Sequence, residues 1–295
     1  MDVSMLEFAG RAQDAFDAAH FKDSYRLAVE GLNGRADHPG LLAIAGRAAM
    51  ELGLDEATTY LGRLVEQTPA DATAWRDLGM ARLNSADLGG AEQALRTAVQ
   101  LDPGDSAMRV SLGHVAYLGG AADEADRQLS EAARMAPADV TALRSLSEMR
   151  RLKGRVQAAI DAADELVRRA PEDIAGTMSL AELNLTLGNY AESLACYRRL
   201  TELDTDQGHA GHIIHAMIEV EICRERWRRA LDYAIIATTL DRHRLTTDLL
   251  AFVSNQLFGT GERPAPPRQE IESRLRARRS EHRRLHAEVL AGLGT

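Results

Sequence analysis

The sequence predicts an all-α fold built from about seven helical hairpins, with further helices at the C-terminus. A pattern of about 34 residues recurs along the chain, and its clearest mark is a proline at each of positions 69, 103, 137 and 171. Apolar residues within each copy are spaced three and four apart, as in Leu41, Ile44 and Ala45, which is the spacing of one helix face. Aromatic residues make up only 4% of the chain, whereas alanine and leucine are abundant, and this favours close-packed helices.

The phase of the prolines divides most of the chain into consecutive repeats. Each repeat is expected to contain a first helix, a tight turn and a second helix that ends near the proline. The expected repeats cover residues 5–37, 38–71, 72–105, 106–139, 140–173, 174–210 and 211–244.

Each part of a repeat has a local signal. Glycine or a polar residue near the hairpin turn is expected to end the first helix, because glycine accepts the left-handed backbone conformation. The glycines at these turns are Gly53, Gly89, Gly154 and Gly188. Alanine at one shared place in the second helix is expected to let two helices approach closely, at Ala57, Ala91, Ala125, Ala159 and Ala230. Aspartate two residues after a proline is predicted to cap the next first helix, at Asp71, Asp105 and Asp139.

The clearest copy of the pattern resembles a known repeat family. It runs from Ala72 to Asp105 and carries Trp75, Leu78-Gly79, Ala91, Leu95, Ala98 and Pro103. This is similar to the tetratricopeptide repeat (TPR), whose signature is Trp-x2-Leu-Gly-x2-Tyr, then Ala-x3-Phe, then Pro. The resemblance implies a right-handed superhelical solenoid. It also implies a non-enzymatic protein–protein interaction scaffold or adaptor that holds a partner peptide or helix in a concave groove.

The same resemblance implies which residues line that groove. In this family they occupy the second, fifth, ninth, twelfth and thirteenth places of each first helix, which here include Arg76, Met80, Asn84, His114, Tyr117, Arg144, Glu148, Arg151, Glu182 and His215. Arginine recognises carboxylates with two parallel hydrogen bonds, so an acidic peptide segment is the expected protein partner. The alternative is that Arg144 and Arg151 pair with Glu148 and Glu182 and bind nothing. The lysine–asparagine pairs with which TPR co-chaperones bind a C-terminal carboxylate do not occur.

A histidine cluster is the sharpest candidate for chemistry. His212, His215 and Glu219 share one helix face, and His209 precedes them. Two histidines and a carboxylate can bind a divalent metal, so a metal-binding enzyme is one alternative function. The spacing is not that of the zinc proteases, and no phosphate-binding loop or nucleophile motif occurs. We therefore predict no catalytic residue, no cofactor and no enzyme activity.

The C-terminal part departs from the repeats. Residues 5–258 are expected to form the repeat array, closed by a capping helix over Leu245–Phe258. Residues 259–267 form a Pro/Gly linker, and residues 268–292 a basic amphipathic helix. Residues 259–295 carry eight arginines and five glutamates, a net +3. This helix could dock on its own repeats, or it could join copies of the chain into a homo-oligomer, which makes a self-assembling structural protein the other alternative.

Charge and composition argue against several other classes of protein. The net charge of −9 argues against nucleic-acid binding. No run of about 18 apolar residues occurs, so no membrane span is expected, and the N-terminus lacks the regions of a secretory signal. The two cysteines, Cys196 and Cys223, have no metal-ligand spacing, and we expect a cytoplasmic protein. Lys22 and Lys153 are the only lysines among many arginines, which indicates GC-rich codons and a bacterial source.

Overall fold

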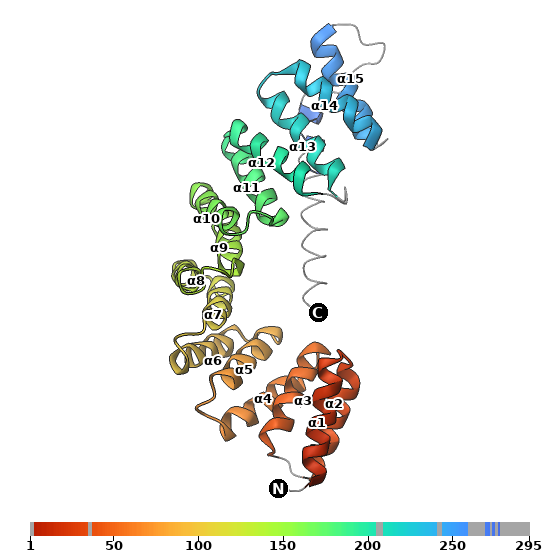
Figure 1. The fold of residues 1–295 in the computed structure, drawn as a ribbon. Coiled ribbons are helices and arrows are strands. Elements are labelled where there is room, and N and C mark those ends of the chain that lie inside the picture. The colour runs from red at the N-terminus through yellow and green to blue at the C-terminus, as the bar shows by residue number, and fades with distance from the viewer. Residues whose placement is uncertain are drawn as a thin grey trace. The chain divides into compact units, whose positions relative to one another are not determined.

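The computed structural model describes residues 3–34, 37–204, 209–240, 244–258, 269–271, 273–274 and 277. In this part of the chain the regular structure is entirely α-helical, and the helices follow one another as hairpins (Figure 1). The all-α repeat architecture predicted from the sequence is therefore confirmed. By its internal contacts the chain divides into an N-terminal unit, Met1–Leu146, and a C-terminal unit, Ser147–Thr295.

The N-terminal unit contains four hairpins and the start of a fifth. Its helices are α1 (Val3–Asp17), α2 (Phe21–Gly34), α3 (Pro39–Glu51), α4 (Glu56–Gln67), α5 (Ala72–Asn84), α6 (Leu88–Leu101), α7 (Ser106–Leu118), α8 (Ala122–Met135) and the first half of α9 (Thr141–Leu152). Each helix from α1 to α7 packs against the next one. The first helices of successive hairpins also touch, α1 on α3, α3 on α5 and α5 on α7, so they form a continuous face.

The C-terminal unit continues the same scheme. Its helices are the rest of α9, α10 (Val156–Arg169), α11 (Ile174–Leu187), α12 (Tyr190–Leu203), α13 (Ala210–Cys223), α14 (Trp227–Leu240) and α15 (Arg244–Phe258). The expected capping helix is α15, which starts one residue earlier than predicted. Its Leu249, Phe252 and Val253 are buried in a cluster with side chains of α13 and α14, so the helix covers the last hairpin.

Small residues set the distance between the two helices of a hairpin. The alanines at the shared place are at most 3% exposed, namely Ala57, Ala91, Ala125, Ala159 and Ala230. In the hairpins α3–α4, α5–α6 and α7–α8, a glycine in the first helix also faces a leucine of the second helix. A Cβ atom added to Gly79 would lie 2.6 Å from Leu95 Cγ, and one added to Gly113 would lie 2.8 Å from Leu129 Cγ. Because glycine has no side chain, the two helices of such a hairpin can pack closely together.

Every hairpin turn in the described chain contains one residue with a positive φ angle. These residues are Ala19, Gly53, Ala86, Gly120, Gly154, Gly188 and Glu225. The predictions for Gly53, Gly154 and Gly188 are thus confirmed. The prediction for Gly89 is wrong, because Gly89 lies in the first turn of α6 and Ala86 takes the left-handed conformation instead. The hydrogen bonds of the turn hold alanine in this conformation, and the Ala86 N–H donates to Leu83 O at 2.9 Å.

The predicted aspartate caps are present at the repeat junctions. Asp71 Oδ1 accepts hydrogen bonds from the N–H groups of Thr73 and Ala74, at 2.9 and 3.4 Å. Asp105 does the same for Ala107 and Met108, and Asp139 accepts from Thr141 N–H. These bonds satisfy N–H groups that have no partner inside the helix, so each junction has a fixed entry into the next repeat.

The predicted linker, residues 259–267, lies outside the described residues, as does most of the predicted helix 268–292. The described residues of that helix are helical. Among them, Ile271 is fully buried in the cluster formed by α13, α14 and α15. Arg274 forms ion pairs with Asp248 of α15 and with Glu270. These residues therefore dock on the last helices of their own chain.

Candidate protein-binding face

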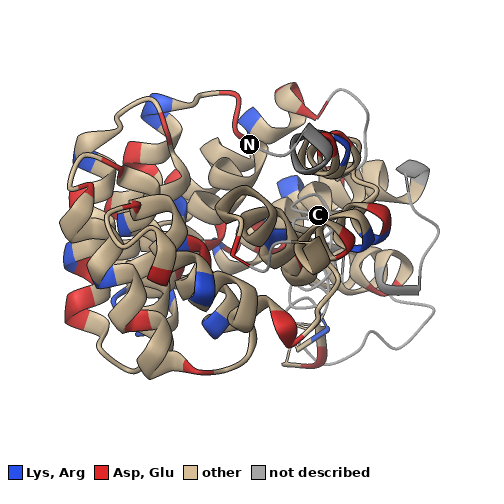
Figure 2. Ribbon diagram, turned by 90° about the horizontal axis from the view of Figure 1, so that it is seen from below, with Lys and Arg blue, Asp and Glu red and all other residues tan. Residues whose placement is uncertain are grey.

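The first helices of the N-terminal unit bring six of the predicted groove residues onto one face. We call it the first-helix face, and it consists of Arg76, Met80 and Asn84 on α5, His114 and Tyr117 on α7, and Arg144 on α9. Asn84 and His114 are exposed, and the other four are half-buried. Acidic and basic residues are interspersed along the helices (Figure 2), so the way each arginine is paired decides what the face can bind.

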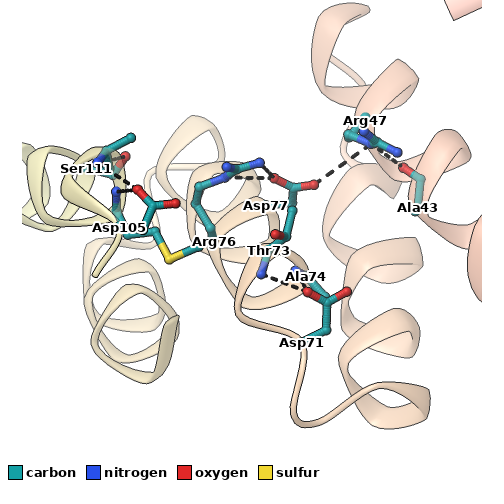
Figure 3. Close-up of polar contacts among 11 residues, drawn as sticks. Ala43, Arg47, Asp71, Thr73, Ala74, Arg76, Asp77, Asp105 and Ser111 are labelled. Atoms are coloured by element: carbon teal, nitrogen blue, oxygen red, sulfur yellow. Dashed lines mark hydrogen bonds and ion pairs between the residues drawn. The ribbon is translucent and has the colours of Figure 1, made fainter. Parts of the chain in front are cut away.

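A buried aspartate organises the charges at one end of this face (Figure 3). Asp77 Oδ1 accepts hydrogen bonds from Arg76 Nη2 at 2.9 Å and from Arg76 Nε at 3.2 Å. Its other oxygen, Oδ2, lies 3.9 Å from Nε of Arg47 on α3. The Asp77 side chain is only 9% exposed, whereas Arg47 and Arg76 are about one third exposed. One buried carboxylate thus holds two accessible guanidinium groups, which leaves a local excess of positive charge.

Arg47 is held in place from a second side. Its guanidinium lies 5.7 Å from the centre of the Phe16 ring, and its Nε donates to Ala43 O at 3.3 Å. A cation over an aromatic face is attracted by the ring. Arg47 is not among the residues predicted from the sequence, because it lies at a place of the first helix that the family does not assign to the groove. The sequence did contain one signal for this arrangement, namely an acidic residue, Asp77, next to Arg76 at a place where the helix is expected to be buried.

His114 joins two first helices. Its Nε2 lies 2.8 Å from Ser145 Oγ of α9. Desolvation of the ring lowers the pKa of His114, so the ring is neutral at pH 7. His114 therefore contributes a neutral polar group to the face rather than a third positive charge.

The predicted groove residues of the C-terminal unit behave differently. Arg151 pairs with Glu148, with 2.7 Å between Arg151 Nε and Glu148 Oε2, as the alternative interpretation expected. Glu182 and His215, which were expected to line the groove, are 8% and 2% exposed. They face neighbouring helices rather than solvent, so the structure does not make them part of an open face.

The histidines each face a different side chain. His212 Nε2 lies 3.9 Å from Glu182 Oε1, and His215 Nε2 lies 3.0 Å from Thr246 Oγ1 of α15. His209 Nδ1 lies 3.2 Å from Asp204 Oδ1. Within the described residues, no group of three histidine, cysteine, aspartate or glutamate side chains is placed to hold a metal ion. The histidines therefore make polar contacts of α13 with α11 and α15, and His209 makes one with the residue that follows α12.

The sequence itself was compared with known families. The pattern described as "Tetratricopeptide repeat" matches residues 45–106 and 110–174, and a second pattern of that description matches residues 178–207. Together the matches cover about half of the chain. The chain belongs to the tetratricopeptide repeat family. No curated protein matches the chain in sequence.

Solved structures share the fold. The C-terminal part of a TPR repeat-containing protein from Cytophaga hutchinsonii is 15% identical, with a TM-score of 0.61, over 86% of this chain and 96% of that one. PilW, a type IV pilus biogenesis factor, is 12% identical with a TM-score of 0.59, over 68% of this chain and 94% of its own. YrrB, a TPR protein with an unusual peptide-binding site, is 17% identical with a TM-score of 0.52, over 65% of this chain and 96% of its own.

Family membership supports a general role. A tetratricopeptide repeat fold supports a scaffold for protein–protein interaction, and such proteins are generally not enzymes. In the described part of the chain no helix is long and apolar enough to cross a membrane.

Proposed function

We propose that this protein is a non-enzymatic adaptor that binds an acidic segment of a partner protein on its first-helix face. The observation that supports this is the arrangement of Arg47 and Arg76 around the single buried carboxylate of Asp77. A guanidinium group has five N–H donors, and one shared carboxylate leaves several of them available. An aspartate or glutamate of a partner would meet two positioned cations there.

The rest of the face suits a peptide. Met80 is a flexible apolar contact, and Asn84 and His114 add hydrogen-bonding groups that carry no charge at pH 7. Arg144 on α9 extends the positive charge along the face. An extended or helical peptide with spaced acidic residues would therefore find cations at intervals and apolar contacts between them.

The test is a comparison of two triple variants in affinity capture from cell extract. The face variant carries R47A, R76A and R144A. The control variant carries R96A, R127A and R134A, which removes three arginines from the second helices α6 and α8. Those three are paired with carboxylates of their own helix, and their removal makes the same change in net charge.

Proteins that the wild type and the control variant retain should be lost by the face variant, as measured by quantitative mass spectrometry. A synthetic peptide from the acidic segment of a captured protein should then bind the wild type more weakly as salt is raised. Equal retention by both variants would contradict the proposal, as would a captured protein whose binding segment carries no acidic residue.

A further inference from the structure

A second basic site lies in the C-terminal unit, at the turn between α13 and α14. Arg224, Arg226, Arg228 and Arg229 fall within six residues of a chain whose net charge is −9. Arg229 Nη1 lies 3.9 Å from Glu221 Oε1. Within the described chain, the side chains of Arg224, Arg226 and Arg228 make no hydrogen bond or ion pair. This differs from Arg76 and Arg151, each of which is bonded to a carboxylate of its own helix.

These arginines line a pocket. Arg226, Arg228 and Arg229 surround an open cavity of about 480 Å³ together with Glu225, Trp227 and Leu257. The cavity opens broadly to solvent. Three arginines against one glutamate give the lining a net positive charge.

The apolar part of the lining is fixed by the core. The Trp227 ring packs edge to face on Phe252 of α15, with 6.0 Å between ring centres. Leu257, near the end of α15, forms the facing apolar contact. Both Trp227 and Leu257 pack against the buried cluster of α13, α14 and α15. The pocket therefore presents a positioned aromatic ring and an aliphatic side chain beside cations.

Glu221 lies beneath this site and anchors Arg229. Its side chain is fully buried, and within the described residues neither carboxylate oxygen accepts a hydrogen bond. A buried carboxylate needs a positive partner, and Arg229 is the cation beside it. Arg229 is itself 55% exposed, so its remaining donors are open to the solvent side.

We propose that this pocket binds a carboxylate side chain of an acidic peptide, with a neighbouring apolar residue of the peptide against Trp227 and Leu257. Unpaired guanidinium groups bind carboxylates with short charge-assisted hydrogen bonds. The aromatic and aliphatic lining requires an apolar group next to the anion, which a peptide supplies. This site is separate from the first-helix face and belongs to the C-terminal unit.

Tryptophan fluorescence gives a direct test, because the chain has two tryptophans, Trp75 and Trp227. In full-length W75F protein, Trp227 is the one remaining reporter. The probe is the N-acetylated, C-amidated peptide Gly-Glu-Glu-Leu-Glu-Gly, and the control peptide has glutamine in place of each glutamate. A third peptide carries phosphoserine in place of each glutamate.

We expect a saturable change in Trp227 fluorescence with the glutamate peptide and none with the glutamine peptide. Adding R226E and R228E should weaken binding about tenfold or more, because two charge-assisted contacts are lost. The matched control adds R11E and R198E, which makes the same charge change at two other exposed arginines and should leave the affinity unchanged. Adding R76A and R144A should also leave the signal unchanged, which separates this pocket from the first-helix face.

Three results would overturn the proposal. If both charge-reversal pairs weakened peptide binding equally, only the long-range attraction between the protein and the peptide would be responsible. Equal binding of the glutamine peptide would remove the role of the carboxylate. Binding of the phosphoserine peptide alone would assign the pocket to phosphorylated partners instead. Circular dichroism of each variant confirms that it retains its helix content.

Discussion

Leu95 of α6 packs directly onto the bare backbone of Gly79 on α5. A Cβ atom at position 79 would lie 2.6 Å from Leu95 Cγ and 3.3 Å from Ala91 O. The two helices of this hairpin are therefore as close as a glycine allows, and the same contact recurs between Gly113 and Leu129.

Gly79→Ala should destabilise the protein by about 1–3 kcal/mol, because the added methyl group overlaps Leu95 and the helices must separate. Gly62→Ala is the matched control, since no atom lies within 4 Å of a Cβ at that position of α4. It should stabilise the protein by about 0.5–1 kcal/mol through lower backbone entropy in the unfolded state. Thermal unfolding measures both. Equal effects of the two changes would contradict the contact.

Ala91→Leu should also destabilise, by roughly 1–3 kcal/mol, because the larger side chain has no room at a place that is fully buried. Ala125→Leu should behave the same way in the next repeat. The measurement is the unfolding midpoint in urea. A wild-type midpoint for either variant would show that the shared alanine place is not a close contact.

The turn residues give a prediction with opposite signs. Ala86 has φ of 60° and Gly154 has φ of 72°, and an L-residue in this region pays about 1–2 kcal/mol. Ala86→Gly should therefore stabilise the protein by about 0.5–1 kcal/mol, after the entropy of glycine is counted. Gly154→Ala should destabilise it by about 1 kcal/mol. Denaturant unfolding of the pair is the measurement, and the same sign for both would refute the argument.

Cys196 should react slowly in the folded protein. Burial raises the pKa of its thiol to about 11, and a higher pKa means that less of the reactive thiolate is present at a given pH. Far less of the thiol is therefore ionised at pH 8 than the roughly one in four expected at the ordinary pKa of about 8.5. Alkylation by iodoacetamide, followed by peptide mass spectrometry, should be at least about a hundredfold faster in denaturant. Similar rates in the two states would contradict the burial of Cys196.

The C-terminal segment can be tested through Ile271. Ile271→Ala should lower stability by about 2–5 kcal/mol, because the side chain is fully buried among α13, α14 and α15. The control is Ile235→Ala on α14, where the side chain is 51% exposed and the effect should stay within about 0.5 kcal/mol. Docking on the same chain also predicts that limited proteolysis near residue 263 does not depend on protein concentration. Protection that appears only at high concentration would point to docking between copies.

Local signals in the sequence were sufficient for the hairpins and their caps. Asp71 and Asp105 were predicted correctly, because a cap depends on a side chain and backbone two or three residues away. Gly89 was placed wrongly, because the turn conformation depends on where the helix ends, and Ala86 can adopt it as well. Contacts between repeats were harder to predict. Arg47 and Asp77 lie 30 positions apart in the sequence, which is not the repeat period.

Burial explains why two predicted groove residues do not lie on an open face. Glu182 and His215 occupy places that the family uses for its groove, but here they contact His212 and Thr246. A place in the repeat determines the direction of a side chain from its helix. Whether solvent reaches that side chain depends on what the following helices bring against it.

The aspartate caps have a consequence for how this chain can change its length. Asp71 and Asp105 stand 34 residues apart and bond the same two backbone groups, two and three positions further on. Deletion of residues 72–105 would place Ser106 directly after Asp71 and recreate the same junction. Duplication of that segment would do likewise, since each repeat contacts mainly its neighbours. The chain can therefore gain or lose whole repeats through recombination, because the new junction has the same capping contacts as the existing ones.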